Sequence, residues 1–133
     1  MGQTALGFML KRLREERGLS LRELAQLGEL DHAYIYRLET GDKEAPSEDT
    51  LAKLVRGLKA GKREAEMLRY VAKFPDTDPE LLNYVFSNPA EPDLSFELFS
   101  SVASINHRGN PRTDYAKLFA RVRKIIAEED QSG

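Results

Sequence analysis

The chain has 133 residues, a formal net charge of −2 and no cysteine. The absence of cysteine excludes a disulfide framework, a cysteine zinc site, a thiolate nucleophile and an iron–sulfur cluster. The longest unbroken apolar run is the four residues 33–36. A membrane span needs roughly 20 apolar residues, so we expect a cytoplasmic protein. A chain of this length can form one domain or two small ones.

Charge is distributed unevenly along the chain. Residues 1–74 carry 14 Lys and Arg against 12 Asp and Glu, a net of +2, whereas residues 75–133 carry 6 against 10, a net of −4. Domains that bind nucleic acid usually have a basic excess, which makes the first part the better candidate for contact with DNA. An asymmetry of this size also arises by chance, so the sequence motifs are needed to identify the part that contacts DNA.

Apolar residues recur with helical spacing along almost the whole chain, and no strand pattern is present. The pattern predicts an all-α protein with five helices before residue 75. We expect the first helix to end at Gly18 and the second to run from the Ser20–Glu23 capping box to about residue 28. The third is expected over 32–40, between an Asp31 cap and Gly41. The fourth should begin after the Ser47 cap, and the fifth should cover about 62–73.

Residues 74–79 contain two prolines and two acids, which predicts a connection between domains. We therefore divide the chain into a domain over residues 1–74, a linker over 75–79 and a second helical domain over 80–133. In the second domain we expect a short helix near 81–86, a proline-bearing loop at 88–93, a helix over 94–104 and a last helix over about 113–129.

The second domain has more large apolar side chains than about 55 residues can bury internally. This surplus predicts a homodimer held together by a hydrophobic interface. The expected interface residues are Phe96, Phe99, Val102, Tyr115, Leu118, Phe119, Val122, Ile125 and Ile126. The alternative is an intact small bundle packed against the first domain.

The second and third expected helices, joined by a short turn, have the outline of a helix-turn-helix, in which the second of the two helices enters the major groove of DNA. Several spaced positions agree with this outline: Ala25, Leu30, Ile35, Leu38, Glu39 and Gly41, followed by Pro46-Ser47 and Thr50-Leu51. Over about residues 5–58 the sequence resembles the Cro/repressor-type (XRE) helix-turn-helix family. The resemblance implies a five-helix DNA-binding domain and a salt bridge between Arg14 and Glu39.

The turn departs from the family pattern at one position. Glu29 occupies the place usually filled by glycine, and Gly28 lies one residue earlier. Glycine is favoured there because it adopts positive φ angles without strain. Either the turn is rebuilt around Gly28, or Glu29 tolerates the strained conformation.

The resemblance implies that base edges are read by the exposed side of the third helix, through His32, Ala33, Tyr36 and Arg37. An arginine such as Arg37 can bond bidentately to guanine. The alternative for His32 is a plain polar surface residue, and Tyr34 is expected in the core.

Phosphate contacts are expected from Ser20, Arg22, Lys43 and Ser47, at or near the starts of the second and fourth helices. The alternative for Lys43 is a cancelled charge, because it lies between two acids in the sequence.

The segment 105–112, Ile-Asn-His-Arg-Gly-Asn-Pro-Arg, carries a second resemblance together with the helix that follows it. It is similar to the C-terminal region of the DdrO-type damage-response repressors. This implies a partner, an ImmA/IrrE-type metallopeptidase that cuts before an Arg-Gly pair, which here is the bond between His107 and Arg108. A histidine replaces the apolar residue before the cut, and the loop is about one residue shorter. The alternative is that Gly109-Asn110-Pro111 makes an interhelical turn.

The sequence has no phosphate-binding glycine loop and no recognisable triad signature, and its two histidines are too few for a metal site. We therefore expect no enzyme, no cofactor and no metal. Two functions remain. The first is a dimeric repressor that binds double-stranded DNA at a palindromic operator. The second is an antitoxin or protein-interaction module on a helix-turn-helix scaffold, and a steep salt dependence of DNA binding would separate the two.

Overall fold

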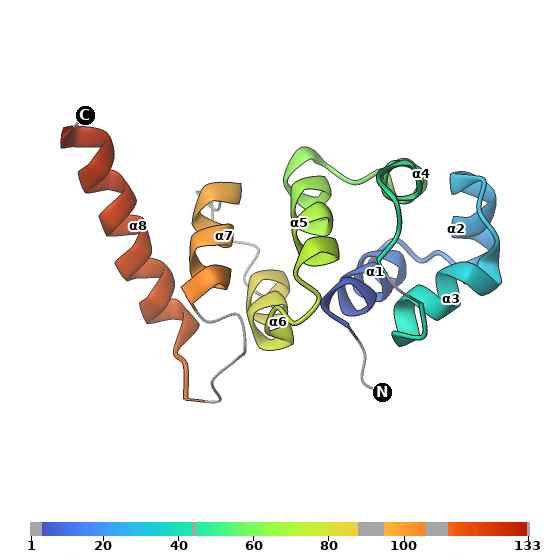
Figure 1. The fold of residues 1–133 in the computed structure, drawn as a ribbon, viewed down its shortest axis with the longest axis horizontal. Coiled ribbons are helices and arrows are strands. Elements are labelled where there is room, and N and C mark those ends of the chain that lie inside the picture. The colour runs from blue at the N-terminus through green and yellow to red at the C-terminus, as the bar shows by residue number, and fades with distance from the viewer. Residues whose placement is uncertain (1–3, 44, 88–94, 106–111, 133) are drawn as a thin grey trace. The chain divides into compact units, whose positions relative to one another are not determined.

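The computed structural model describes residues 4–43, 45–87, 95–105 and 112–132, with the backbone alone described at 130–132. The described residues form helices joined by turns and no strands (Figure 1), as predicted. The helices are α1 Ala5–Glu16, α2 Leu21–Gly28, α3 His32–Thr40, α4 Glu48–Leu58, α5 Lys62–Lys73, α6 Pro79–Ser87, α7 Phe96–Ile105 and α8 Tyr115–Ser132. Among the described residues, no helix has the length and apolar character needed to cross a membrane.

The chain divides into two compact units, residues 1–76 and residues 77–133. The first contains α1 to α5 and the second contains α6 to α8.

The helix ends of the first unit follow the caps that the sequence predicts. The Ser20 hydroxyl accepts from the Glu23 amide at 3.0 Å, and the Glu23 carboxylate accepts from the Ser20 amide at 2.9 Å, which completes the capping box. Asp31 caps α3 by accepting from the Ala33 amide at 3.2 Å. Gly41 ends the same helix with φ at 86°, where glycine has no steric penalty. The predicted limits of α3, residues 32 and 40, are confirmed.

Glycines allow the helices of the first unit to cross closely. A Cβ atom built on Gly28 would lie 2.9 Å from the Lys53 carbonyl oxygen, and one on Gly57 would lie 3.1 Å from the Gly28 nitrogen. The α2–α4 crossing therefore requires both glycines. At the α1–α3 crossing, a Cβ on Gly7 would lie only 2.6 Å from the Glu39 carbonyl oxygen. Fully buried side chains fill the space around these crossings: Met9, Leu10, Leu13, Leu24, Ile35, Leu38, Leu54 and Leu58.

The turn between α2 and α3 keeps its usual backbone conformation despite the missing glycine. Glu29 is left-handed, with φ at 57° and ψ at 48°, and it follows the last residue of α2. A non-glycine residue in this conformation costs about 1 to 2 kcal/mol. Gly28 does not rebuild the turn, because it remains helical and packs against α4.

The expected linker over 75–79 contains two buried residues and the start of a helix. Thr77 is 1% exposed and Asp78 is 8% exposed, and α6 already begins at Pro79. Asp78 caps α6 by accepting from the Glu80 amide at 3.1 Å. Its second carboxylate oxygen accepts a hydrogen bond from the Tyr115 hydroxyl of α8. Asp78 and Pro79 therefore form the start of α6, and the boundary between the two compact units falls within the predicted linker, after residue 76.

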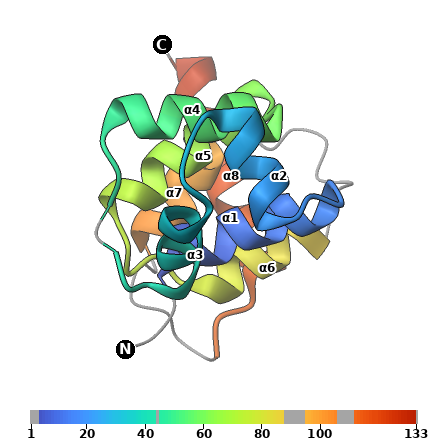
Figure 2. The ribbon, with the colours of Figure 1, turned by 90° about the vertical axis from the view of Figure 1, so that its right-hand side faces the viewer.

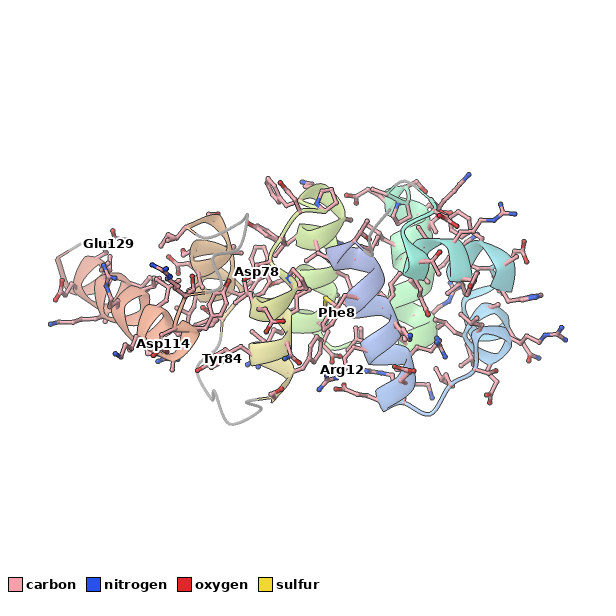
Figure 3. The ribbon with its side chains drawn as sticks, turned by 90° about the horizontal axis from the view of Figure 1, so that it is seen from below. Phe8, Arg12, Asp78, Tyr84, Asp114 and Glu129 are labelled. Carbon is pink, nitrogen blue, oxygen red and sulfur yellow. The ribbon has the colours of Figure 1, made fainter. Side chains whose placement is uncertain are left out.

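The second unit buries much of the apolar surplus that the sequence assigns to a dimer interface. Phe99, Val102, Tyr115, Phe119 and Val122 are at most 7% exposed. These five side chains are buried within the unit, where α7 and α8 pack together and the Tyr84 ring of α6, labelled in Figure 3, stacks on Phe119 at a centroid distance of 5.3 Å.

The remaining members of the predicted interface keep contact with solvent. Ile125 is 52% exposed, and Phe96, Leu118 and Ile126 are partly exposed. The loop expected at 88–93 and the bond between His107 and Arg108 lie outside the described residues.

Candidate nucleic-acid interface

Helix α3 has one side in the core of the first unit and one side facing outward (Figure 2). Ile35, Leu38 and Glu39 on the inner side are at most 4% exposed. The outer side presents the four predicted base-reading residues: His32, Ala33, Tyr36 and Arg37. Three of these are exposed and Ala33 is half-buried. The helical period of 3.6 residues separates the two sets, because residues one or two apart point in different directions.

An ion pair fixes the inner side of α3 to α1. Arg14 Nε donates to one Glu39 carboxylate oxygen at 2.7 Å, and Arg14 Nη2 donates to the other at 3.0 Å. The third guanidinium nitrogen, Nη1, donates to the Leu19 carbonyl oxygen at 2.8 Å. The hydrogen bond to Glu39 raises the pKa of Arg14 above its usual value. This is the pair that the family resemblance implies, and it holds the C-terminal half of α3 rigidly.

Tyr34 and Thr50 join the start of α3 to α4. Burial raises the pKa of the Tyr34 hydroxyl, and a hydrogen bond with Thr50 acts in the opposite direction. The Ser47 hydroxyl accepts from the Thr50 amide at 3.2 Å and donates to the Thr50 hydroxyl at 3.1 Å. Because Ser47 already uses its hydrogen atom within the chain, its hydroxyl has no donor left for a phosphate.

The four predicted phosphate contacts are all exposed, but their surroundings differ. Among the described residues, Arg22 and Lys43 have no side-chain partner, so their charges remain available to an anion. Ser20 has a hydroxyl that accepts within the capping box. The start of α4, next to Ser47, carries Glu48 and Asp49 in its first turn, which repel a phosphate at that helix end.

His32 and Asp31 are neighbours at the start of α3. The His32 Nδ1 atom lies 3.8 Å from an Asp31 carboxylate oxygen, too far for a hydrogen bond. Their side chains are 48% and 70% exposed. His32 therefore remains accessible to a partner, while the adjacent carboxylate lowers the local positive potential.

Two arginines outside the predicted set also determine the geometry of the unit. Arg17 donates to the Leu58 carbonyl oxygen and, through Nη2, to Glu64 at 2.7 Å, so it joins the end of α1 to α4 and α5. Arg56 lies 3.5 Å from a carboxylate oxygen of Glu29. No local sequence signal identifies these contacts, because 47 residues separate Arg17 from Glu64.

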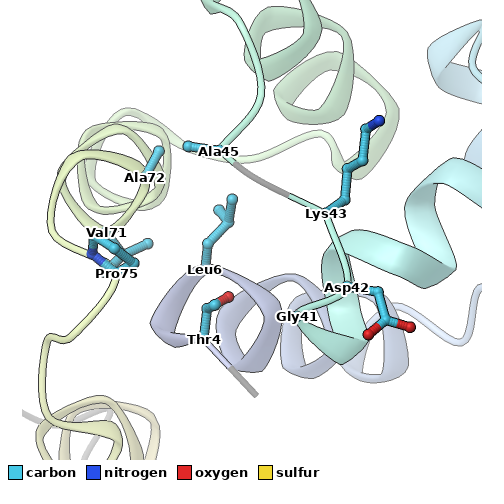
Figure 4. Close-up of a pocket in the computed structure, with 9 residues that line it drawn as sticks. All are labelled: Thr4, Leu6, Gly41, Asp42, Lys43, Ala45, Val71, Ala72 and Pro75. Atoms are coloured by element: carbon cyan, nitrogen blue, oxygen red, sulfur yellow. The ribbon is translucent and has the colours of Figure 1, made fainter. Parts of the chain in front are cut away.

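A hollow of about 470 Å³ lies beside the loop between α3 and α4 (Figure 4). Leu6, Ala45, Val71, Ala72 and Pro75 give it a mostly apolar wall, and Thr4, Gly41, Asp42 and Lys43 complete the lining. The charged side chains of Asp42 and Lys43 point away from Leu6 and Ala72. Among its described lining residues, the hollow therefore has no inward charged group that could do acid–base chemistry.

Comparison with known proteins assigns the first unit. Residues 5–68 match a protein-family model described as a helix-turn-helix domain. The N-terminal unit contains a helix-turn-helix domain. The matched residues include α1 to α4 and the first part of α5, and the pair of helices α2 and α3 forms the motif itself. No curated protein matches the chain.

Proposed function

We propose that the chain is a sequence-specific transcription regulator of the XRE type, a repressor that binds a palindromic operator as a homodimer. The proposal rests on the difference between the inner and outer sides of α3. Its inner side is fixed by buried side chains and by the Arg14–Glu39 pair, while Arg37 on its outer side has no side-chain partner among the described residues. A rigid helix with an unpaired arginine on its outer side suits the major groove.

In this proposal α3 reads bases and the residues around it contact phosphates. Arg37 bonds to a guanine edge, while His32 and Tyr36 contact neighbouring bases from the same exposed side. Arg22 near the start of α2 and Lys43 after α3 contact the DNA backbone. Because the Ser47 hydroxyl is used internally and Glu48 and Asp49 follow it, we assign the start of α4 the weakest of these contacts.

A dimer supplies the affinity that one helix-turn-helix lacks. A single module buries little DNA surface, whereas two modules related by a two-fold axis hold two half-sites about 34 Å apart. The exposed apolar side chains of the second unit, with Ile125 foremost, support an interface in that unit.

The test is selection of bound duplexes from a random DNA pool, followed by binding assays of variants on the selected site. Arg37→Ala should weaken binding by about 1 to 3 kcal/mol and relax the preference at one base position. Arg22→Ala should weaken binding to all sequences alike and reduce its salt dependence. Arg69→Ala, an exposed arginine on α5, is the matched control and should bind like the parent. Equal affinities for all three variants would refute the docking.

The charge of the motif favours a second candidate function. Residues 20–50 contain eight Asp and Glu but only three Lys and Arg. Two of these acids, Glu39 and Glu29, are paired with Arg14 and Arg56, but the excess remains negative and repels DNA. A protein-interaction module or antitoxin built on this scaffold fits that charge. It predicts no enriched sequence in the selection and no DNA affinity that rises steeply at low salt.

We also propose that proteolysis inactivates the repressor. A cut between His107 and Arg108 by an ImmA/IrrE-type metallopeptidase would separate α8 from the rest of the chain. Helix α8 contributes Tyr115, Phe119 and Val122 to the core of the second unit. Their loss would leave α7 without its packing partner and would remove the proposed dimer interface.

A further inference from the structure

Helix α8 has 18 residues, and its fully buried side chains, among those described, all lie in its first half. Its buried residues are Tyr115, Phe119 and Val122. From residue 123 to residue 129, no described side chain of α8 is fully buried. Most helical stability in proteins comes from the tertiary packing of one face, and the described part of the second half of α8 buries no side chain fully.

A stripe on α8 faces away from the core of the second unit. Leu118, Arg121, Ile125 and Glu128 follow one another at intervals of three, four and three residues, which places them on one face of the helix. Ile125 is 52% exposed at the middle of this stripe. Leu118 is partly exposed and lines a shallow hollow together with Ile105, which is 63% exposed.

The charges of α8 are arranged against the dipole of their own helix. Positive residues occupy the first part, at Lys117, Arg121, Arg123 and Lys124, and negative residues follow at Glu128, Glu129 and Asp130. The first turn has no acidic residue and the last turn has no basic residue. Within one helix this order is unfavourable, because the dipole prefers acids at the start and bases at the end.

We propose that α8 pairs antiparallel with α8 of a second copy of this chain. In an antiparallel pair the basic first part of each helix lies beside the acidic end of the other, so the unfavourable order within one helix becomes complementary between two. A centre near Ile125 brings the two Ile125 side chains together. With a rise of 1.5 Å per residue, Arg121 then lies about 6 Å from the centre and the partner's Glu128 about 4.5 Å from it on the same side, close enough in height to pair. The two-fold axis repeats this pair.

The inference rests on the dimeric regulator proposed above for its biological role, and it specifies which surface makes the dimer. Arg121 and Glu128 are exposed, and neither has a side-chain partner within the described part of the chain. Substituting them therefore leaves the core of the second unit intact.

The experiment is a charge exchange in the full chain, with dimerisation measured by sedimentation equilibrium. Arg121→Glu and Glu128→Arg should each weaken the dimer at least about tenfold, because two attractive pairs become two repulsive ones. The double variant with both changes should dimerise like the parent. An equimolar mixture of the two single variants should form a heterodimer, since every pair in it is attractive.

Lys124→Glu is the control, because it changes the net charge as much as Arg121→Glu but lies about 100° around the helix from Ile125. It should change the dimer affinity less than about threefold. A monomeric parent chain, a double variant as weak as the singles, or a control as damaging as Arg121→Glu would overturn the pairing. If the pairing fails while the parent still binds a palindromic site as a dimer, only this inference fails. If no duplex DNA is bound, the proposed function fails and the pairing is judged by sedimentation alone.

Discussion

The buried pair between Arg14 and Glu39 provides a quantitative test of how α3 is held. Arg14→Ala removes the bidentate partner of the Glu39 carboxylate, which is 4% exposed. Breaking a buried ion pair on one side typically costs 3 to 5 kcal/mol. The Arg14 side chain is 13% exposed, so water can reach part of the vacated site and we expect the lower end, about 3 kcal/mol.

The control for this prediction is Arg12 on the same helix. Arg12 pairs with Glu16 at 2.9 Å, with both side chains more than 30% exposed, so Arg12→Ala should cost less than about 0.5 kcal/mol. Glu39→Ala combined with Arg14→Ala should be less destabilising than the sum of the single changes, with a coupling of about 1.5 kcal/mol or more.

Urea unfolding of the full chain, followed by circular dichroism, gives the free energies. Native-state hydrogen exchange of the α1 and α3 amides assigns the loss to the first unit. Equal unfolding midpoints for Arg14→Ala and Arg12→Ala would refute the claim that this pair fixes the helix.

Three further predictions follow from the helix ends and from α8. Gly28→Ala should destabilise the first unit by about 1 to 3 kcal/mol because its Cβ would collide with the α4 backbone. Glu29→Gly should stabilise the same unit by about 0.5 to 1 kcal/mol because it relieves the left-handed strain. Urea unfolding that shows the same sign of change for both variants would contradict this account. The hydrogen bond from the Ser20 amide lowers the pKa of Glu23 from its ordinary value of 4.5. The stabilisation of α2 by the Glu23 carboxylate should therefore be fully present above pH 4.5 and be lost as the pH falls through the lowered pKa. In an NMR titration of the α2 amides, a Glu23→Gln chain should lack this step. Deletion of residues 108–133 should give a monomer that no longer holds its operator, and sedimentation showing an intact dimer would exclude a cut at His107 as the switch.

The sequence predicted the first unit accurately because its helix ends have local chemical causes. Ser20 with Glu23, Asp31, Gly41 and Ser47 each act within a few residues of their own position, so the ends of α2, α3 and α4 can be derived from neighbouring residues. The outer side of α3 follows from the helical period once these ends are known.

Features that depend on distant residues could not be derived in this way. The reason for Gly28 lies in the Lys53 carbonyl oxygen of another helix, and two partners of Arg17, Leu58 and Glu64, lie 41 and 47 residues away in the sequence. The burial of Asp78 within the expected linker could not be derived either, because its hydrogen bond with Tyr115 spans 37 residues. A sequence count does not show how three helices pack, so it could not separate the apolar side chains that the second unit buries from those that it leaves exposed.

The separation of the two sides of α3 has a consequence for how such a protein can evolve. Stability depends on Ile35, Leu38 and Glu39, whereas the proposed contacts with bases depend on side chains that touch little of the fold. Substitutions at Tyr36 or Arg37 should therefore change the preferred operator at almost no cost in folding free energy. After a gene duplication, two copies of this chain could acquire separate target sites through a few surface changes. The same property would let an engineer exchange the outer residues of α3 and leave the scaffold untouched.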